Sequence, residues 1–275
     1  MVKVLIIGSN SYIGKAVKNY LDSETDYDVN SISVRNISIV PDMFIGYKVV
    51  IDVIGIAHIK ETVENRQIYH AVNYTLTVDI ANAAKKAGVQ QFILLSSMSV
   101  YGLTVGRITK NTVPHPNTVY GKSKFQADEE IKKLENETFK FVCIRPPMVY
   151  GENCKGNYQR LRKFALKFPV FPSYANKRSM IYIGNLVEFV RTTIQFERSG
   201  LFFPQNAEYV NTARMVELIA YNHNKNIRLT KAFNWVIRII PSKVVKKVFG
   251  DLIYEPVDTV DKYGFEESIR LAEQK

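Results

Sequence analysis

The sequence opens on an apolar run that leads directly into a turn bounded by two glycines: Val2-Lys3-Val4-Leu5-Ile6-Ile7-Gly8-Ser9-Asn10-Ser11-Tyr12-Ile13-Gly14. An apolar run of this kind is typical of a parallel strand that is covered on both faces. A helix is expected to follow the turn, over residues 13–21. A glycine turn at a helix N-terminus offers free backbone N–H groups to a pyrophosphate. The alternative interpretation is a turn with a purely structural role.

The first 150 residues continue to alternate between strands and helices. We expect strands at residues 28–34, 48–54, 91–95 and 141–144, and helices over residues 72–87 and from residue 120 onward. This alternation predicts an α/β fold with a doubly wound parallel sheet. The connection between residues 34 and 48 contains Pro41 and is too short for a full crossover helix, so we expect it to be truncated or irregular. Residues 1–150 are assigned mainly to this core. Residues 151–275 are assigned mainly to a smaller substrate-binding lobe, with some segments returning to the core.

Composition argues against several classes of protein. No segment approaches the roughly 18–20 uninterrupted apolar residues that span a bilayer. The two cysteines, Cys143 and Cys154, do not suggest a disulfide framework and fit a reducing cytoplasm. No Cys/His cluster has the spacing of metal ligands, so no metal is expected. The net charge of +11 comes from scattered lysines without a nucleic-acid motif, and no nucleic-acid partner is expected.

A tyrosine and a lysine with helical spacing indicate proton-transfer chemistry. In Tyr120-Gly121-Lys122-Ser123-Lys124, the pair at i and i+4 lies on one face of a helix. A nearby ammonium favours the phenolate and is expected to lower the pKa of Tyr120. Ser97, in the segment that follows the strand at residues 91–95, offers a hydroxyl to hold a substrate oxygen. A turn-forming serine is the alternative for Ser97.

These motifs together resemble the extended short-chain dehydrogenases/reductases, in the NAD-dependent epimerase/dehydratase group that acts on nucleotide sugars. Within that group the chain is most similar to sugar-tailoring enzymes of bacterial capsule and O-antigen pathways. The resemblance covers about residues 2–220. The segments that match the family pattern are the turn Gly8–Gly14, Ser96–Gly102, Tyr120–Lys124, Ile144–Gly151, Cys154–Leu161, Arg178–Ile183 and Asn185–Val187.

The resemblance implies a Rossmann-like core and a role for each matching residue. Ser97, Tyr120 and Lys124 would form the catalytic triad. The cofactor, NAD(H) or NADP(H), would be bound by Gly8, Ser11, Tyr12, Ile13, Gly14, Arg35, Ile54, Gly55, Asn73, Tyr120, Lys124 and Pro146. A substrate would be bound by Ser97, Asn157 and Arg178, with Arg178 gripping the diphosphate as a planar, permanently charged group can.

The chain also departs from the family pattern. Ser11 replaces the usual middle glycine, and Met148 stands where classical UDP-galactose epimerases carry Asn. The segment that normally holds the third strand and an adenine-contacting Asp is largely missing. The second strand ends in Ser33-Val34-Arg35, without the carboxylate that binds the ribose of NAD. Arg35 therefore favours NADP(H), unless it is an ordinary surface arginine.

The leading hypothesis is a nucleotide-sugar epimerase of surface polysaccharide biosynthesis. Tyr120 would take the hexose C4 hydroxyl proton as hydride passes to the nicotinamide, and the keto-sugar would turn over before hydride returns. An NADPH-dependent 4-keto-sugar reductase is the close alternative. A non-catalytic nucleotide-binding protein on the same fold is a third, although such proteins typically lose the tyrosine or lysine.

Two weaker signals remain. The histidines, at positions 58, 70, 115 and 223, are isolated, and only His58 is placed by sequence to approach a substrate. The segment 232–249 is apolar with basic flanks. It is interpreted as a core helix, as a helix of a homodimer, or as a membrane-surface element that would suit a lipid-linked sugar on a peripheral cytoplasmic enzyme.

Overall fold

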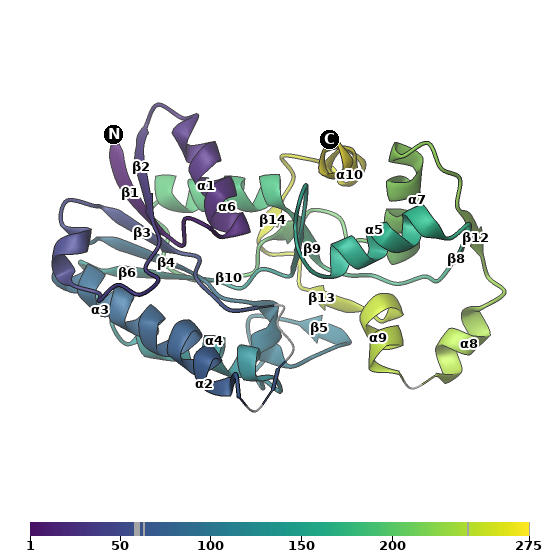
Figure 1. The fold of residues 1–275 in the computed structure, drawn as a ribbon, viewed down its shortest axis with the longest axis horizontal. Coiled ribbons are helices and arrows are strands. Elements are labelled where there is room, and N and C mark those ends of the chain that lie inside the picture. Colours follow the sequence, from purple (N-terminus) through teal and green to yellow (C-terminus); the bar gives the residue numbers. More distant parts are fainter. Residues whose placement is uncertain (58–60, 63, 241, 275) are drawn as a thin grey trace. The chain divides into compact units, whose positions relative to one another are not determined.

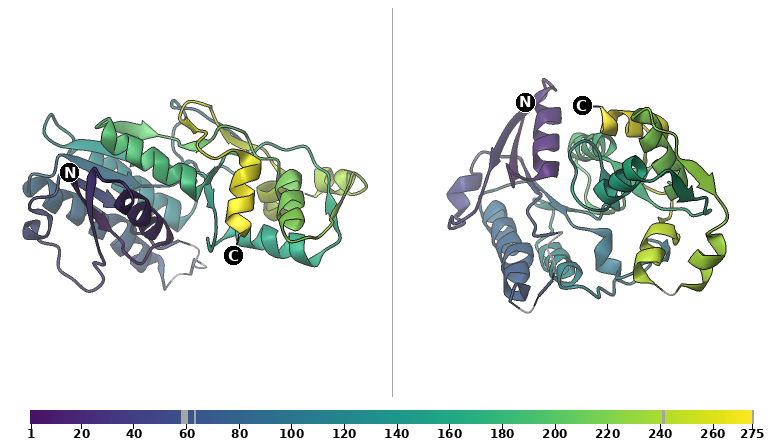
Figure 2. Two further views of the ribbon diagram at one scale, coloured as in Figure 1. Left: turned by 90° about the horizontal axis from the view of Figure 1, so that it is seen from above. Right: turned by 45° about the vertical axis from the view of Figure 1, so that its right-hand side comes forward.

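The computed structural model describes every residue of the chain except 58–60, 63, 241 and 275. The described residues form two compact units, and the chain crosses between them several times (Figures 1 and 2). Unit 1 contains Met1–Gly102, Pro114–Pro146 and Val187–Phe203. Unit 2 contains Leu103–Val113, Pro147–Leu186 and Pro204–Lys275.

Unit 1 is built on a six-stranded parallel sheet with the strand order β10-β6-β4-β3-β1-β2. The strands are β1 (Val2–Ile7), β2 (Tyr27–Ile32), β3 (Val49–Asp52), β4 (Gln91–Leu95), β6 (Lys140–Ile144) and β10 (Gly200–Phe202). This order confirms the predicted doubly wound sheet, because the chain builds outward to one side of β1 and then to the other. In register, Ile7 pairs with Asp52 and Asp52 with Leu94, so the carboxyl ends of β1, β3 and β4 meet at one edge.

Helices cover both faces of this sheet. Figure 1 shows α1 (Tyr12–Asp22) and α6 (Ile183–Gln195) on one face, with α3 (Thr77–Lys86) and α4 (Val119–Lys132) on the other. Both faces of β3 and β4 are therefore buried, which explains their mainly apolar sequences. The helix predicted over residues 72–87 begins earlier than expected, with α2 (Arg66–His70) and a π-helical turn, η2 (Ala71–Leu76). The exposed polar residues of α2 gave no apolar face from which to detect it.

The predicted truncated connection between the second and third strands is confirmed. A single 3₁₀ turn, η1 (Pro41–Phe44), lies between β2 and β3, and it buries Phe44 in the core. β2 is consequently the edge strand of the sheet, in agreement with the expectation that the segment holding the family's next strand is largely missing.

Unit 2 combines helices with short pairs of parallel strands. The helices α5 (Asn157–Lys167) and α10 (Phe265–Glu273) pack against α7 (Thr212–Asn222), and two short helices follow α7: α8 (Asn234–Ile239) and α9 (Lys243–Phe249). The strand pairs are β7 (Met148–Tyr150) with β9 (Met180–Tyr182), β8 (Val170–Pro172) with β12 (Arg228–Thr230), β13 (Leu252–Tyr254) with β5 (Gly106–Ile108), and β11 (Gln205–Asn206) with β14 (Thr259–Val260).

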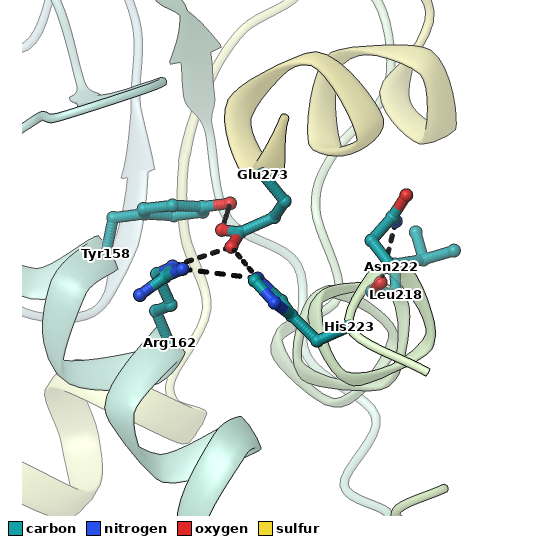
Figure 3. Close-up of polar contacts among 6 residues, drawn as sticks. All are labelled: Tyr158, Arg162, Leu218, Asn222, His223 and Glu273. Atoms are coloured by element: carbon teal, nitrogen blue, oxygen red, sulfur yellow. Dashed lines mark hydrogen bonds and ion pairs between the residues drawn. The ribbon is translucent and has the colours of Figure 1, made fainter. Parts of the chain in front are cut away.

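A buried carboxylate fastens the C-terminal helix to the rest of unit 2 (Figure 3). Glu273 on α10 accepts hydrogen bonds from the Tyr158 hydroxyl (2.6 Å) and Arg162 Nε (2.6 Å), and it contacts His223 Nε2 at 2.7 Å. The Glu273 side chain is fully buried, so these partners replace its lost hydration. Within the described part of the chain, no helix combines the length and hydrophobicity needed to cross a membrane.

Candidate active site

The glycine turn joins β1 to α1. Gly8 has a φ of +112°, which favours glycine. A Cβ added to Gly14 would lie 2.6 Å from the Gly8 carbonyl oxygen, so the turn closes only around glycine. Ser11, in place of the family's middle glycine, caps the helix by accepting a hydrogen bond from the Gly14 N–H at 2.9 Å. The first turn of α1, at Tyr12 and Ile13, is thus held at the carboxyl end of β1, an arrangement that favours a phosphate group.

Arg35 lies beyond the end of the second strand. β2 ends at Ile32, two residues earlier than predicted, and Arg35 follows on an exposed loop. Its guanidinium forms no ion pair with any described residue. The preference for NADP(H) that it suggests stays a prediction.

The segment that follows β3 is tied to α4 by Asn73. This residue is completely buried on η2. Its Oδ1 accepts a hydrogen bond from the Ile56 N–H (2.7 Å), and its Nδ2 donates to the Ile56 carbonyl (3.1 Å) and to Ser123 Oγ (3.2 Å). Gly55 is thereby placed beside Lys124, whose Cε would lie 3.4 Å from a Cβ at position 55. Three segments that are distant in sequence, at residues 55–56, 73 and 123–124, therefore meet at one end of the sheet.

Ser97, Tyr120 and Lys124 lie together where β4 ends and α4 begins. Ser97 caps the 3₁₀ turn that follows β4, and its hydroxyl forms a side-chain hydrogen bond with Tyr120. Tyr120 and Lys124 are one turn apart on α4, as their spacing predicted. The start of α4 packs directly on the 3₁₀ turn, because a Cβ on Gly121 would come within 2.6 Å of the Ser99 carbonyl oxygen.

Lys124 is a buried cation held by backbone oxygens. Its ammonium donates to the carbonyls of Ile54 and Leu95, each at 2.9 Å, and the side chain is almost fully buried. An ammonium has three donors, so one remains available to a ligand. Burial lowers the pKa of Lys124, and the negative charge of Asp52 partly offsets this effect.

The expected lowering of the Tyr120 pKa by Lys124 is not found in this structure. Burial raises the pKa of Tyr120 above its ordinary value, and the hydrogen bond from Ser97 only partly counters the rise. The Lys124 ammonium donates to the Ile54 and Leu95 carbonyls, and burial dominates the surroundings of the phenol. The phenol is therefore protonated in the ligand-free chain at neutral pH.

Two buried carboxylates at this end of the sheet were missed by sequence reasoning. Asp52, the last residue of β3, is fully buried; its Oδ1 accepts a hydrogen bond from the Ile54 N–H at 2.8 Å. Burial raises the pKa of Asp52 from its ordinary 3.8 to about 6, against the influence of Lys124. A carboxylate inside the apolar run Val49–Ile54 was the available signal.

The second carboxylate, Asp128, belongs to a closed network. Its Oδ2 accepts hydrogen bonds from Ser96 Oγ (2.8 Å) and Arg145 Nε (3.0 Å), and Arg145 Nη1 donates to the Tyr101 hydroxyl (2.9 Å). The next residue, Pro146, is buried, and its carbonyl accepts the Met98 N–H at 3.0 Å. This network fixes the backbone around the predicted nicotinamide-facing segment.

Arg178, in unit 2, is a partly buried cation without a carboxylate partner. Backbone bridges to Val210 and Leu252 fix its position, and its Nη1 donates to the Gly250 carbonyl at 2.7 Å. The guanidinium forms no ion pair with any described residue. Burial lowers the pKa of Arg178, and the charge of Asp251 only partly compensates.

The remaining predicted residues are less informative. Asn157 is exposed at the first position of α5. His58 lies outside the described residues, the ring of His70 contacts that of Tyr74 in a tilted arrangement, and His223 contacts Glu273. Among the described residues, no group of three or more His, Cys, Asp or Glu side chains is arranged to hold a metal ion.

The family model "NAD dependent epimerase/dehydratase family" matches residues 4–202. The chain belongs to this family. A UDP-glucose 4-epimerase from Vibrio cholerae is 28% identical over 95% of this chain and 90% of that protein. An N-acetyl-α-D-glucosaminyl-diphospho-ditrans,octacis-undecaprenol 4-epimerase from Escherichia coli O157:H7 is 30% identical over 72% of this chain and 64% of that protein.

A solved structure supports the fold over almost the whole chain. The UDP-glucuronic acid 4-epimerase from Bacillus cereus, in complex with NAD, aligns with a TM-score of 0.77 at 15% identity, covering 99% of this chain and 97% of that one. At this level of identity the likeness establishes the fold and leaves the substrate open.

Proposed function

We propose that the chain is a nicotinamide-dependent epimerase acting at C4 of a hexose attached to a diphosphate. The observation that carries the proposal is the convergence of Ser97, Tyr120 and Lys124 at the carboxyl end of β4, beside the glycine turn of the same sheet. Ligands of doubly wound sheets bind at this edge. The match to the epimerase/dehydratase family supports the same assignment.

The residues present fit a nicotinamide dinucleotide. Gly8 and Gly14 let the turn close tightly at the start of α1, and the N–H groups of Tyr12 and Ile13 would meet the pyrophosphate. Ile54, Gly55 and Asn73 would line the site, and Pro146 would lie along the nicotinamide. When bound, the nicotinamide supplies the acceptor and donor of the C4 hydride.

The side chains of the triad would manage the proton. Tyr120 would remove the proton of the C4 hydroxyl and later return it, while the Ser97 hydroxyl would hold the sugar oxygen. Lys124, through its remaining donor, would orient a ribose hydroxyl, and its positive charge would favour the phenolate once a ligand draws it toward Tyr120. Because burial raises the pKa of the Tyr120 phenol, the phenol would first have to release its proton to solvent, a step favoured by the positive charge of Lys124, before it could accept the proton of the C4 hydroxyl.

Arg178 and Asn157 would bind the substrate. A fixed guanidinium without a carboxylate partner suits a diphosphate, since charge-assisted hydrogen bonds to phosphate are strong. Both a nucleoside diphosphate and a polyprenyl diphosphate present this group, and the relatives include an epimerase named for each kind of substrate. A role in the synthesis of surface polysaccharide stays a prediction, and a lipid-linked substrate would place the enzyme at the membrane surface. A homodimer stays a prediction.

A 4-keto-sugar reductase is the second candidate, and Arg35 favours it. The exposed guanidinium stands at the end of β2, where a 2′-phosphate of NADPH would lie, and no carboxylate follows the strand to select NAD. Net reduction would consume NADPH, whereas epimerisation would leave the cofactor unchanged.

The test is a substrate panel with purified enzyme. UDP-glucose, UDP-N-acetylglucosamine and undecaprenyl-diphospho-N-acetylglucosamine are each incubated with catalytic NAD, and products are resolved by NMR or chromatography. The proposal expects inversion at C4 without net change in NADH absorbance. Stoichiometric oxidation of NADPH with a 4-keto sugar would establish the reductase instead. Cofactor binding without turnover of any sugar would leave the non-catalytic alternative.

A further inference from the structure

The short helices α8 and α9 display large apolar side chains to solvent. Trp235, Ile239 and Val244 are 64%, 66% and 69% exposed, and Phe233 and Ile240 are exposed as well. The interpretation of segment 232–249 as a core helix is therefore wrong for these residues. The two helices are consecutive in the chain and lie next to each other in unit 2 (Figures 1 and 2). Exposed apolar groups in one place commonly mark an interaction site.

Contacts at both ends of the segment hold it in place. Asn234 Nδ2 donates to the Ser173 carbonyl at 2.8 Å, and the ring of Phe249 packs against Phe171 with a centroid separation of 5.6 Å. The Val248 carbonyl accepts a hydrogen bond from Thr212 Oγ1 at 2.8 Å. The exposed side chains are thus carried by a backbone that is anchored to unit 2.

The charge of this region is of one sign. The sequence contains no Asp or Glu between Glu217 and Asp251. Five basic side chains stand among the apolar ones, all exposed and without an ion-pair partner among the described residues: Lys231, Arg238, Lys243, Lys246 and Lys247. A symmetric dimer through this face would bring the same cations together, because a two-fold interface pairs a patch with its own copy. A surface of negative charge is the complementary partner.

We propose that α8 and α9 form a docking patch for an anionic lipid bilayer. The patch consists of Phe233, Trp235, Ile239, Ile240 and Val244 with the five basic residues named above. The apolar side chains would enter the boundary between headgroups and acyl chains, where tryptophan is favoured, while the lysines and the arginine would meet anionic headgroups. The inference concerns where the protein sits and does not depend on the reaction it catalyses.

Trp235 is the sole tryptophan of the chain, so it reports directly on the patch. The full-length protein is titrated with equimolar phosphatidylglycerol/phosphatidylcholine vesicles and with phosphatidylcholine vesicles. With the anionic vesicles, we expect a blue shift of the tryptophan emission and quenching by phospholipid brominated on the acyl chain. With the neutral vesicles, we expect binding at least about tenfold weaker, because the headgroup attraction is missing.

Two variants separate the apolar and the charged contributions, with co-sedimentation as the readout. Vesicle affinity should fall by about tenfold or more in each variant. The apolar variant is Trp235→Ala/Val244→Ala, and the charge variant is Lys243→Glu/Lys246→Glu/Lys247→Glu. The matched controls are Phe196→Ala, whose side chain is also 64% exposed, and Lys86→Glu/Lys132→Glu/Lys163→Glu, which makes the same change in net charge at other exposed sites. The controls should bind nearly as well as the unaltered protein.

Three results would overturn the proposal. The first is an unshifted tryptophan in the presence of anionic vesicles. The second is an equal loss of binding in the lysine variant and its control, since this would show attraction by net charge alone. The third is a concentration-dependent blue shift with a doubling of mass in the absence of lipid, which would make the patch a dimer interface. Turnover of a soluble nucleotide sugar is measured separately, so failure of the docking patch and failure of the proposed reaction are distinguishable.

Discussion

Arg145 in unit 1 and Arg178 in unit 2 are two guanidiniums withdrawn from solvent, and their surroundings differ in one respect. Arg145 is paired with Asp128 and hydrogen-bonded to Tyr101, and although burial acts against its charge, Asp128 raises its pKa overall. Arg178 has a backbone carbonyl and no carboxylate partner among the described residues, and burial lowers its pKa. We propose from this difference that the first charge holds the fold, whereas the second binds an anionic ligand.

The largest expected effect is a loss of stability when Arg145, the cation paired with Asp128, is replaced. Arg145→Ala should lower the free energy of unfolding by about 3–5 kcal/mol, because Asp128 would be left as an unpaired buried charge. Urea unfolding measures the loss, and Arg145→Ala/Asp128→Asn should recover part of it. Arg178→Ala, as the matched variant, should change stability little. A loss below about 1 kcal/mol for Arg145→Ala would mean that its ion pair contributes no more than an exposed pair does. The proposed difference in role between Arg145 and Arg178 would then be lost.

Asp52 extends the comparison to a buried carboxylate. Its hydrogen bonds and the nearby charge of Lys124 only partly replace the hydration that it loses on burial. Its pKa is raised from 3.8 to about 6, so between these values the folded state holds a proton that the unfolded state has released. Stability from this group therefore falls as pH rises through that window, by about 3 kcal/mol in total. Asp52→Asn lacks the titration and should gain about this much relative to the unaltered protein between pH 4 and pH 7. Parallel unfolding curves for the two proteins across this range would contradict the assignment.

Tyr120→Phe tests a hydroxyl that we assign to chemistry rather than to stability. Turnover should fall by at least about 10²-fold, because proton transfer by a positioned side chain contributes that much. NAD(H) binding, followed by fluorescence, and the unfolding midpoint should change little. Tyr221→Phe, at an exposed site, is the control. A variant that kept more than about a tenth of the rate would rule out Tyr120 as the acid and base.

Arg178→Ala tests the available cation directly. The KM for the diphospho-sugar should rise by about ten- to a hundredfold, while cofactor affinity holds, because each charge-assisted hydrogen bond contributes about 1.5–3 kcal/mol. Arg178→Lys should recover only part, since lysine lacks the bidentate geometry. Arg228→Ala, at an exposed arginine, should leave KM unchanged. An unaltered KM in Arg178→Ala would place the diphosphate elsewhere.

The smallest effect is expected at Arg35, an exposed cation. If it pairs with a 2′-phosphate, Arg35→Ala should weaken NADP(H) binding by several-fold and leave NAD(H) binding nearly unchanged. Fluorescence titration of both cofactors on the two proteins decides the matter. Equal changes for both cofactors would end the case for NADP(H).

Sequence patterns predicted the parts of the fold that depend on local periodicity. The strand at residues 91–95, the glycine turn and the Tyr120–Lys124 spacing were all visible, because each is set by neighbours within one turn or one strand. The buried carboxylate of Asp128 was not, since its partners Ser96 and Arg145 are brought to it by the tertiary fold, whereas Asp52 left a signal in its apolar run that was not used. The direction of the Lys124 ammonium and the burial that raises the pKa of Tyr120 were unpredictable, because both are set by the tertiary fold.

The most direct test of the proposed reaction follows the hydrogen at sugar C4. A diphospho-sugar substrate carrying deuterium at C4 is incubated with the enzyme and NAD in ordinary water, and the product is examined by NMR. The account predicts a product of inverted configuration that retains deuterium at C4, because the hydride leaves and returns within one active site while Tyr120 exchanges only the hydroxyl proton. Inversion with loss of deuterium to solvent, or stoichiometric consumption of NADPH without inversion of a substrate alcohol, would contradict it.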